Sequence, residues 1–411
     1  MFKIVRIPPK LHIFFESLKD RFLYHHFEYF QLLVVLMAFA WGRHTLSALY
    51  RHLDSRTRPH RSRFNNFLKV GRWDPAATLH QKAHELLAAL CPQAREVIEL
   101  ILDDSKKAKR GQHMEAAGWI HDPTTGRTVW GHQYVCAVLH FRGQVIPWGI
   151  RLYVKKEQCR KLGHPFRKTT QLAADLIREF TPPKGVQVRV LFDSYYLCPA
   201  VVSTCRDQGF RYVSTLKGNR NLFRNGQKLK TAKHGQALFR KHKKTSFQIT
   251  KPDGKVSYTY VDAGWLKVNG IGQAHGVFSR KNHDRRILGL VTDDPSLSAR
   301  QIIRIYNDRW CIEVYFKDSK QLLGLGQYQN LSREAAVTHL HMVCFAQALL
   351  THLAIHRRGA QGQQPSATRL STAGLQNELR RMVWKDLTDH LKRFSTGDQL
   401  IKELQRLLIA A

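Results

Sequence analysis

The sequence is poor in acidic residues. It has 31 Asp and Glu against 66 Lys and Arg, which leaves a formal net charge of +35 at pH 7. Because like charges repel one another in a compact chain, such an excess opposes folding unless a polyanion neutralises it. Nucleic acid is the usual polyanion for a protein of this composition, and an acidic membrane surface is the competing partner.

The sequence also lacks an apolar run of membrane-spanning length. Its most apolar run, FQLLVVLMAFAW at residues 30–41, is about a dozen residues long, whereas a helical span needs about 20. With 43% hydrophobic residues the chain can bury a substantial core, so we expect a buried core helix here and no membrane association. The segment MFKIVRIPPK predicts no secretory signal, since it has no charged start followed by a long apolar stretch.

Paired cysteines and nucleotide-binding loops are missing as well. The seven cysteines are scattered without a CxxC pair, which argues for reduced thiols, a cytoplasmic protein and no structural zinc. There are 22 histidines, but His339 and His341 lie two positions apart on a predicted helix, so they cannot chelate a metal together. No P-loop occurs, so the sequence does not indicate ATP as a partner.

Residues 1–95 show the apolar periodicity of helices. The connection SRTRPHRSRFNN within this region is rich in arginine: Arg56, Arg58, Arg61 and Arg63. A small helical bundle with an arginine-rich turn suits DNA binding, while the alternative is a packing domain with a charged, solubilising surface. We predict a helical DNA-binding domain here.

A strand pattern begins at about residue 96. The apolar run at 97–102 predicts a strand that ends in Asp103 and Asp104, and the runs at 133–141 and 144–154 predict a hairpin. Strands and helices then alternate, so that 96–217 forms the first part of one core. Strands that first form a meander and then alternate with helices indicate a mixed α/β sheet covered by helices.

Residues 218–283 interrupt this core. Over 217–246 there are ten Lys or Arg and no Asp or Glu, and neither helix nor strand periodicity is clear. A predicted hairpin with a Pro-Asp-Gly turn follows. We therefore predict a basic, β-rich insertion, after which the core resumes at 284–326 and a helical region fills 327–411.

Acidic residues stand out at three places in this cation-rich chain. Asp103 and Asp104 end the first predicted strand of the core. Asp193 ends a later strand in LFDSYY, and Glu313 lies on a helix after the insertion. Taken singly, each acid is also explained as a turn, a helix cap or a salt-bridge partner. Together, at the edge where an α/β sheet builds its sites, such carboxylates suit Mg²⁺ ions that support phosphoryl transfer.

A helical stripe surrounds the last of these acids. In YNDRWCIEVYFKDSK, four polar residues fall within an arc of roughly 60° at about 100° per residue. They are Tyr306, Arg309, Glu313 and Lys320. Such a stripe is either a solvated, salt-bridged face or a metal-binding carboxylate flanked by phosphate contacts. We predict that this helix stops near Gly324 or Gly326.

These residues resemble the DDE transposases of bacterial insertion sequences, which have an RNase H-like core. The spacing Tyr-x2-Arg-x3-Glu-x6-Lys reproduces the YREK signature of that family in full. DDS resembles the (Asp/Glu)-Asp-Thr element of its first strand, which gives Asp104 the role of metal ligand and Asp103 the flanking position, with Ser105 in place of Thr. LFDSYY matches the second element and gives Asp193. The resemblance covers residues 95–325.

The resemblance implies an α/β fold class, with an RNase H-like core that is interrupted by the β-rich insertion and flanked by all-helical N- and C-terminal regions. It implies cut-and-paste transposition, in which Asp104, Asp193 and Glu313 hold two Mg²⁺ ions, with Mn²⁺ as a substitute. Hydroxyl and cationic groups would grip phosphates near the DNA end. These groups are Tyr306, Arg309, Lys320 and Lys217. Trp310 would either stack on an unpaired or flipped base or pack against the sheet.

The implied partners are transposon-end DNA and target DNA. Joining two DNA ends calls for at least a dimer in the DNA complex. The implied location is the bacterial cytoplasm, at the nucleoid. Two other functions fit the sequence: a transposase-derived DNA-binding protein without catalysis, and a stand-alone RNase H-like nuclease. The intact acids and signature argue against the first, and the basic insertion with its helical flanks argues against the second.

Overall fold

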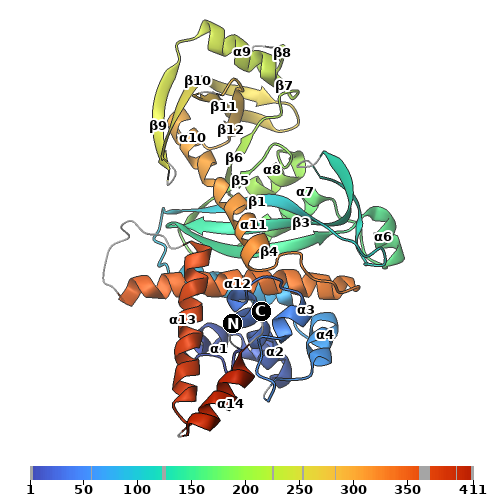
Figure 1. Ribbon diagram of the computed structural model, residues 1–411. Coiled ribbons are helices and arrows are strands. Elements are labelled where there is room, and N and C mark those ends of the chain that lie inside the picture. Colours follow the sequence, from blue (N-terminus) through green and yellow to red (C-terminus); the bar gives the residue numbers. More distant parts are fainter. Residues whose placement is uncertain are drawn as a thin grey trace.

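A computed structural model describes residues 3–408 except residues 57, 123–125, 225, 252–253, 283, 361–370 and 395. Its central feature is one twelve-stranded sheet in the order β2-β3-β1-β5-β6-β12-β11-β10-β7-β8, with β4 paired to β3 and β9 paired to β10. In Figure 1 the core half of this sheet lies in the middle, the insertion lies above it, and a body of helices that contains both chain ends lies below it.

Five strands form the core half of the sheet: β1 (Val97–Ala108), β3 (Arg127–Phe141), β4 (Gln144–Tyr153), β5 (Gln187–Phe192) and β6 (Arg211–Thr215). Their order is β4-β3-β1-β5-β6, and β3 is antiparallel to the other four. A three-stranded meander followed by two parallel strands is the RNase H-like topology, so the predicted fold class is confirmed. The predicted hairpin is β3–β4, and its Arg142-Gly143 turn has positive φ angles of 47° and 73°, which suit the strand twist.

Helices cover both faces of this core sheet. On one face, Leu176 of α7 (Thr169–Arg178) packs against Gly149 of β4, and α8 (Pro199–Asp207) lies beside α7. On the other face, α11 (Trp310–Leu322) lies against β1. Because both faces are covered, residues 98–102 of β1 are all buried, as a near-continuous apolar run predicts. β2 (Gly118–Asp122) pairs with β3 at the end of the sheet, and the short helix α6 (Lys156–Lys161) follows β4.

The insertion extends the core sheet and does not form a separate layer. Its elements are β7 (Asn221–Arg224), β8 (Gln227–Lys230), α9 (Thr231–Lys241), β9 (Thr245–Lys251), β10 (Gly254–Val268) and β11 (Gly272–Lys281). The link to the core is β12 (Leu288–Thr292), which is antiparallel to both β11 and β6. The predicted β-rich character is confirmed for the described residues, and residues 252–253 of the predicted Pro-Asp-Gly turn lie outside them.

One helix of the insertion contradicts the prediction that 217–246 lacks helical periodicity. The 11 residues of α9 bury Thr231, His234, Gly235, Leu238 and Phe239. These positions do follow a helical spacing. The pattern is hidden in the sequence because three of the five buried residues are Thr, His and Gly, which do not register as apolar.

The helix predicted to carry Tyr306, Arg309, Glu313 and Lys320, here called the signature helix, is divided into two. A capping box between Ser298 and Gln301 starts α10 (Ala299–Asp308), and α11 follows after Arg309. Arg309 keeps helical angles, φ −53° and ψ −27°, so the chain continues in nearly the same direction. The predicted stop is confirmed: α11 ends at Leu322, and Gly324 and Gly326 have φ angles of +75° and +77°.

The two terminal regions pack together as one helical body. Its elements are η1 (Pro9–Leu11), α1 (His12–Glu16), η2 (Lys19–Arg21), α2 (Tyr24–Phe39), α3 (Leu46–Tyr50), α4 (Arg61–Val70), α5 (Pro75–Ala88), α12 (Arg333–Ala360), α13 (Thr372–Leu391) and α14 (Gly397–Leu407). The backbone N–H of Lys3 donates to the carbonyl of Leu407 at 2.9 Å, and Arg6 pairs with Asp386 at 2.7 Å. The assignment of residues 1–95 and 327–411 to two separate domains stays a prediction.

Two arginines of the predicted DNA-binding turn have partners inside this body. Arg56 pairs with Glu403 of α14 at 3.3 Å, and the guanidinium of Arg58 lies 4.3 Å from the ring centre of Tyr50. Contacts of this kind hold the turn against the body. The Arg56 side chain still remains 65% exposed, so DNA binding by this turn stays a prediction.

Two apolar helices lie in the core of the body. The predicted core helix at 30–41 is confirmed as part of α2, which is buried from Tyr29 to Phe39 except at Leu32. Within the described residues, one helix, Arg333–Arg357, is long and apolar enough to span a membrane by length and composition. Its apolar window is 89% buried inside the protein, which is the behaviour of a core helix.

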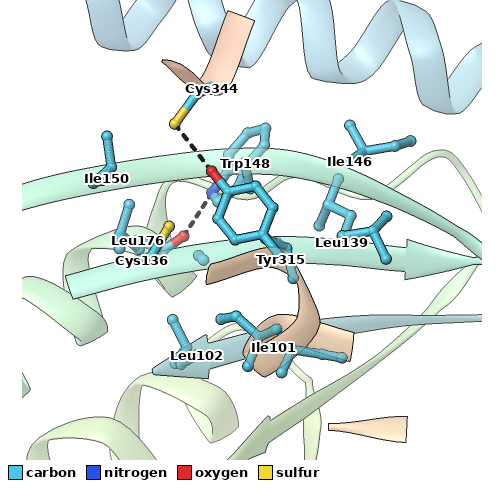
Figure 2. Close-up of a cluster of buried hydrophobic side chains, with 14 of the residues drawn as sticks. Ile101, Leu102, Cys136, Leu139, Ile146, Trp148, Ile150, Leu176, Tyr315 and Cys344 are labelled. Atoms are coloured by element: carbon cyan, nitrogen blue, oxygen red, sulfur yellow. Dashed lines mark hydrogen bonds between the residues drawn. The ribbon is translucent and has the colours of Figure 1, made fainter. Parts of the chain in front are cut away.

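A buried cluster fixes α11 on the sheet (Figure 2). The hydroxyl of Tyr315 lies 3.4 Å from the thiol of Cys344 on α12, and the indole N–H of Trp148 on β4 donates to the carbonyl of Leu176 at 2.9 Å. Tyr315 is two residues after Glu313, so the packing of this ring sets the position of the Glu313 backbone over β1.

Candidate active site

Strand β1 continues past both of its acids. It runs to Ala108, and its pairing with β3 includes Asp103 opposite Cys136 and Asp104 opposite Val135. The prediction that the strand ends at these acids is therefore wrong. Successive side chains of a strand point to opposite faces of the sheet, so the two carboxylates cannot share one site.

Asp103 lies on the α11 face. Its partner in the ladder, Cys136, interacts with Tyr315 of α11. The Asp103 Oδ2 atom accepts a hydrogen bond from Nη1 of Arg309 at 2.9 Å, and its Oδ1 atom accepts one from the Asp104 backbone N–H at 2.9 Å. Burial raises the pKa of Asp103 to about 6, although the positive charge of Arg309 lowers it. A further cation close to Asp103 would stabilise its charged form.

Asp104 lies on the α7 face. Its Oδ2 atom accepts a hydrogen bond from the side-chain amide of Gln133 at 2.8 Å and lies 3.7 Å from Nζ of Lys106. Its Oδ1 atom accepts one from the hydroxyl of Tyr196 at 3.4 Å. Asp104 therefore ties β1 to β3 and to the loop after β5.

Asp193 is the residue after β5. In the parallel pairing of β1 and β5, Ile101 lies opposite Leu191, and the same register carried on by two residues places Asp193 beside Asp103. The Oδ1 atom of Asp193 accepts hydrogen bonds from the backbone N–H groups of Tyr195 at 2.9 Å and Tyr196 at 3.4 Å. The turn thus fixes the direction of this carboxylate.

Glu313 is in the first turn of α11, and its side chain is 32% exposed. Its carboxylate accepts a hydrogen bond from Nη2 of Arg309. Arg309 therefore bridges Asp103 and Glu313. Burial lowers the pKa of the guanidinium, but Tyr306 and the two carboxylates more than offset this, so the pKa of Arg309 lies above its ordinary value.

Arg309 links Asp103 and Glu313 on the α11 face, Asp193 follows the neighbouring strand and acts electrostatically on Asp103, and Asp104 lies on the other face. The expected convergence of Asp104, Asp193 and Glu313 is not found. Among the residues that the structure describes, no three His, Cys, Asp or Glu side chains are close enough to hold one metal ion. The physical reasons are the alternation of β1 and the Arg309 guanidinium, which lies between Asp103 and Glu313.

Two of the predicted phosphate-binding groups, Tyr306 and Lys320, lie on the signature helix beside these acids, whereas Lys217 lies next to Tyr195, whose hydroxyl is hydrogen-bonded to Thr169 of α7. The Tyr306 hydroxyl lies 3.5 Å from Oγ1 of Thr215, next to the end of β6. Lys320 is half-buried in the last turn of α11; burial lowers its pKa, and the charge of Lys107 on β1 lowers it further. Lys217 is exposed, with Nζ 5.5 Å from the ring centre of Tyr195.

Trp310 is 60% exposed at the start of α11. Of the two roles that its sequence position allows, packing against the sheet is therefore wrong. The indole is open to a ligand, and stacking on a base remains a prediction.

Two contributors to the site were missed from the sequence. Lys107 lies on the same strand face as Asp103, and Tyr195 is a 46% exposed aromatic ring next to Lys217. The tyrosines of LFDSYY were a visible signal for the second. No signal was available for the first, because Lys107 stands in the run KKAKR, whose members look alike without the strand register.

Sequence models of two families match the chain. A "DDE superfamily endonuclease" model matches residues 22–257, and a "Transposase DDE domain" model matches residues 167–349. The first match spans more than half of the 411 residues, and the chain belongs to the DDE superfamily of transposase-type endonucleases. Members of this superfamily use divalent metal ions, and the predicted enzyme class is confirmed.

Comparison with solved structures gives a remote likeness. A cryo-EM structure of a piggyBac transposase synaptic complex with hairpin DNA matches with a TM-score of 0.46 and 11% identity, over 93% of this chain and 76% of that one. The search of curated proteins gives no match. An origin in a bacterial insertion sequence stays a prediction, as does a functional YREK signature.

Proposed function

We propose that this enzyme cuts DNA at the ends of a mobile element and joins the freed 3′ end to target DNA. The observation that carries the proposal is the link between Asp103 and Glu313 through Arg309 on one face of an RNase H-like sheet, with Asp193 directly after the neighbouring strand β5. Membership of the DDE superfamily supplies the reaction class.

The donor set fits a hard divalent cation, for which we propose Mg²⁺, with Mn²⁺ as a substitute. Carboxylate oxygens are the ligands that Mg²⁺ prefers. Burial raises the pKa of Asp103, and a cation bound there would stabilise its charged form. Asp193, Glu313 and one aspartate of β1 would hold the metal. Asp103 is the better candidate of the two aspartates, although the sequence motif favours Asp104. Two such ions would activate the attacking oxygen and stabilise the leaving one.

The proposed substrate is DNA, at both the transposon end and the target. The formal charge of +35 supports a polyanionic partner. Tyr306, Arg309 and Lys320 line the acidic face and would hold phosphates of the cleaved end, while exposed Lys217 would contact the backbone further along. Exposed Trp310 would stack on an unpaired base. These residues bind and orient the strand so that its scissile phosphate faces the carboxylates.

The proposed assembly is a dimer on DNA, because two element ends must be cut and joined together. We propose no use of ATP, since hydrolysis of DNA at the element end is exergonic and the joining step exchanges one phosphodiester bond for another. The proposed location is the bacterial cytoplasm, at the nucleoid. An inactive DNA-binding derivative and a stand-alone nuclease are the competing functions.

The test is a cleavage and strand-transfer assay with Mg²⁺ on DNA that carries the ends of the parent element. Cleavage at the element ends followed by joining supports the proposal. Specific binding without cleavage would establish the DNA-binding derivative, and cleavage without end specificity or joining would establish the nuclease.

A further inference from the structure

Arg309 connects β1 with the signature helix through two ion pairs. Its Nη1 atom donates to Asp103 at 2.9 Å and its Nη2 atom donates to Glu313, so one guanidinium satisfies both carboxylates. The Arg309 side chain is 15% exposed, against 20% for Asp103 and 32% for Glu313. The three groups form a partly buried cluster in which one guanidinium offsets one of two carboxylates, so the cluster keeps the net charge of one carboxylate.

We propose that Arg309 is a placeholder cation: it holds the acidic site closed to metal in the DNA-free enzyme and moves to a DNA phosphate when metal binds. The proposal rests on the proposed function, in which Asp103 and Glu313 are metal ligands. It assigns to Arg309 a role before catalysis that is separate from phosphate binding.

Competition for oxygen atoms is the physical basis. The guanidinium occupies the Asp103 Oδ2 atom and the Glu313 Oε1 atom, and its positive charge repels a second cation from these oxygens. A metal ion that takes both oxygens therefore displaces Arg309. A buried guanidinium that loses both carboxylates is left uncompensated unless it finds another anion. A DNA phosphate is such an anion and accepts two parallel hydrogen bonds from the guanidinium fork.

Coupling between metal and DNA follows from this exchange. Each ligand makes the displacement of Arg309 less costly for the other, so each should raise the affinity of the enzyme for the other. The position of Arg309 suits such a movement. It stands at the junction of α10 and α11, outside both helices, so its side chain can reorient without breaking a regular helix. The effect would be to load the site with metal mainly when DNA is in place.

Binding of Mn²⁺ to the DNA-free protein tests the proposal, measured by the loss of the free Mn²⁺ signal in electron paramagnetic resonance. We expect Arg309→Met to bind Mn²⁺ at least tenfold more tightly than the wild type. Lys317→Met is the matched control, because Lys317 is an exposed cation of the same helix that contacts neither carboxylate, and it should bind as the wild type does. Arg309→Lys retains the charge and should keep the weak affinity. Arg309→Gln removes the charge while keeping a polar side chain; it should also bind Mn²⁺ more tightly, and it covers the case in which Arg309→Met does not fold.

A second arm repeats the titration with a random-sequence duplex present. The duplex should tighten Mn²⁺ binding to the wild type and to Lys317→Met, and it should have a much smaller effect on Arg309→Met. Asp103→Asn tests the location of the metal site and should weaken Mn²⁺ binding both with and without the duplex.

The outcomes separate this proposal from the proposed function. If Asp103→Asn loses Mn²⁺ binding while Arg309→Met and Arg309→Gln bind no more tightly than the wild type, Arg309 is a fixed structural ion-pair partner and the metal site stands. If Asp103→Asn, Asp193→Asn and Glu313→Gln all bind Mn²⁺ as the wild type does, the metal site itself is wrong and both proposals fall.

Discussion

Asp103 and Asp104 are neighbours in the chain whose carboxylates lie on opposite faces of the sheet. Asp103 is bound to Arg309 on the α11 face, and Asp104 is bound to Gln133 and Tyr196 on the α7 face. Because Glu313 is on α11, Asp103 is the acid of β1 that can share a cation with it.

The first prediction separates these two aspartates. Asp103→Asn, Asp193→Asn and Glu313→Gln should each reduce Mg²⁺-dependent cleavage by roughly 10³-fold or more, since each removes a ligand worth several kcal/mol in the transition state. DNA binding should hardly change, because an acid removed from a phosphate-binding site does not weaken its attraction for DNA. Single-turnover cleavage and a binding titration measure the two effects.

Asp104→Asn is the matched comparison for this series. It should retain most of the cleavage rate, and the loss of its hydrogen bonds should appear as a lower melting temperature. An inactive Asp104→Asn next to an active Asp103→Asn would restore Asp104 as the ligand, as the sequence motif implies.

The second prediction concerns the cations of the signature. Arg309→Lys and Lys320→Ala should slow cleavage and end joining more than they weaken binding to random DNA, because both residues would position a phosphate at the acidic face. An ammonium group cannot reproduce the two parallel hydrogen bonds of a guanidinium, so Arg309→Lys should not restore the wild-type rate. Rates are compared with Kd values for random and element-end duplexes.

Exposed Lys317 again serves as the control, and Lys317→Ala should cleave at nearly the wild-type rate. A solvated salt-bridge face would behave differently. In that case each substitution would cost at most about 1 kcal/mol of stability and leave the rate of cleavage intact.

The third prediction concerns the charge of the insertion. Affinity for random DNA should fall by orders of magnitude between about 50 and 200 mM salt, because released counterions drive binding. Replacing four exposed lysines of α9 and its C-terminal extension by Gln should lower the slope of log K against log salt by up to about one per lost contact. These residues are Lys233, Lys241, Lys243 and Lys244.

A variant with the same change in charge, made on the helical body, is the control for this series. It replaces Lys10, Lys19, Lys385 and Lys402, which are also exposed. Equal slopes for the two variants would mean that the insertion attracts DNA only through the overall charge. A flat salt response of the wild type would remove the support that net charge gives to DNA binding.

The fourth prediction concerns stability in acid. His339 and His341 are buried residues of α12. Burial lowers the pKa of His339 to about 3 and that of His341 to about 4. The unfolded chain titrates near pH 6.5, so it binds more protons than the folded protein between about pH 6.5 and 4. Folding stability should therefore fall as the pH is lowered through this window, by roughly 2 kcal/mol per histidine at pH 5. Urea unfolding at pH 7 and pH 5 measures it.

His341→Met removes one of these groups and should lessen the loss between pH 7 and pH 5. Exposed His12→Met should leave the loss unchanged. The same dependence on pH in all three proteins would show that other groups govern acid unfolding.

The sequence by itself determined much of the fold and the reaction class. Alternating strand and helix patterns gave the sheet with its covering helices, and Arg142-Gly143 gave the β3–β4 turn, because these signals are local. The spacing of Tyr306, Arg309, Glu313 and Lys320 gave the face of one helix, because helical geometry fixes which residues share a side. The charge of +35 indicated a polyanionic partner without any knowledge of the fold.

Only the tertiary structure decided which groups meet. β1 is covered on both faces, so residues 98–102 are all buried and the sequence carries no alternation from which to read the side of Asp103 or Asp104. α9 was hidden because its buried face is built partly from Thr, His and Gly. The bridge from Arg309 to Asp103 joins residues 206 positions apart, and such a contact depends on how α11 packs over β1, which the Tyr315 cluster fixes and no local pattern encodes.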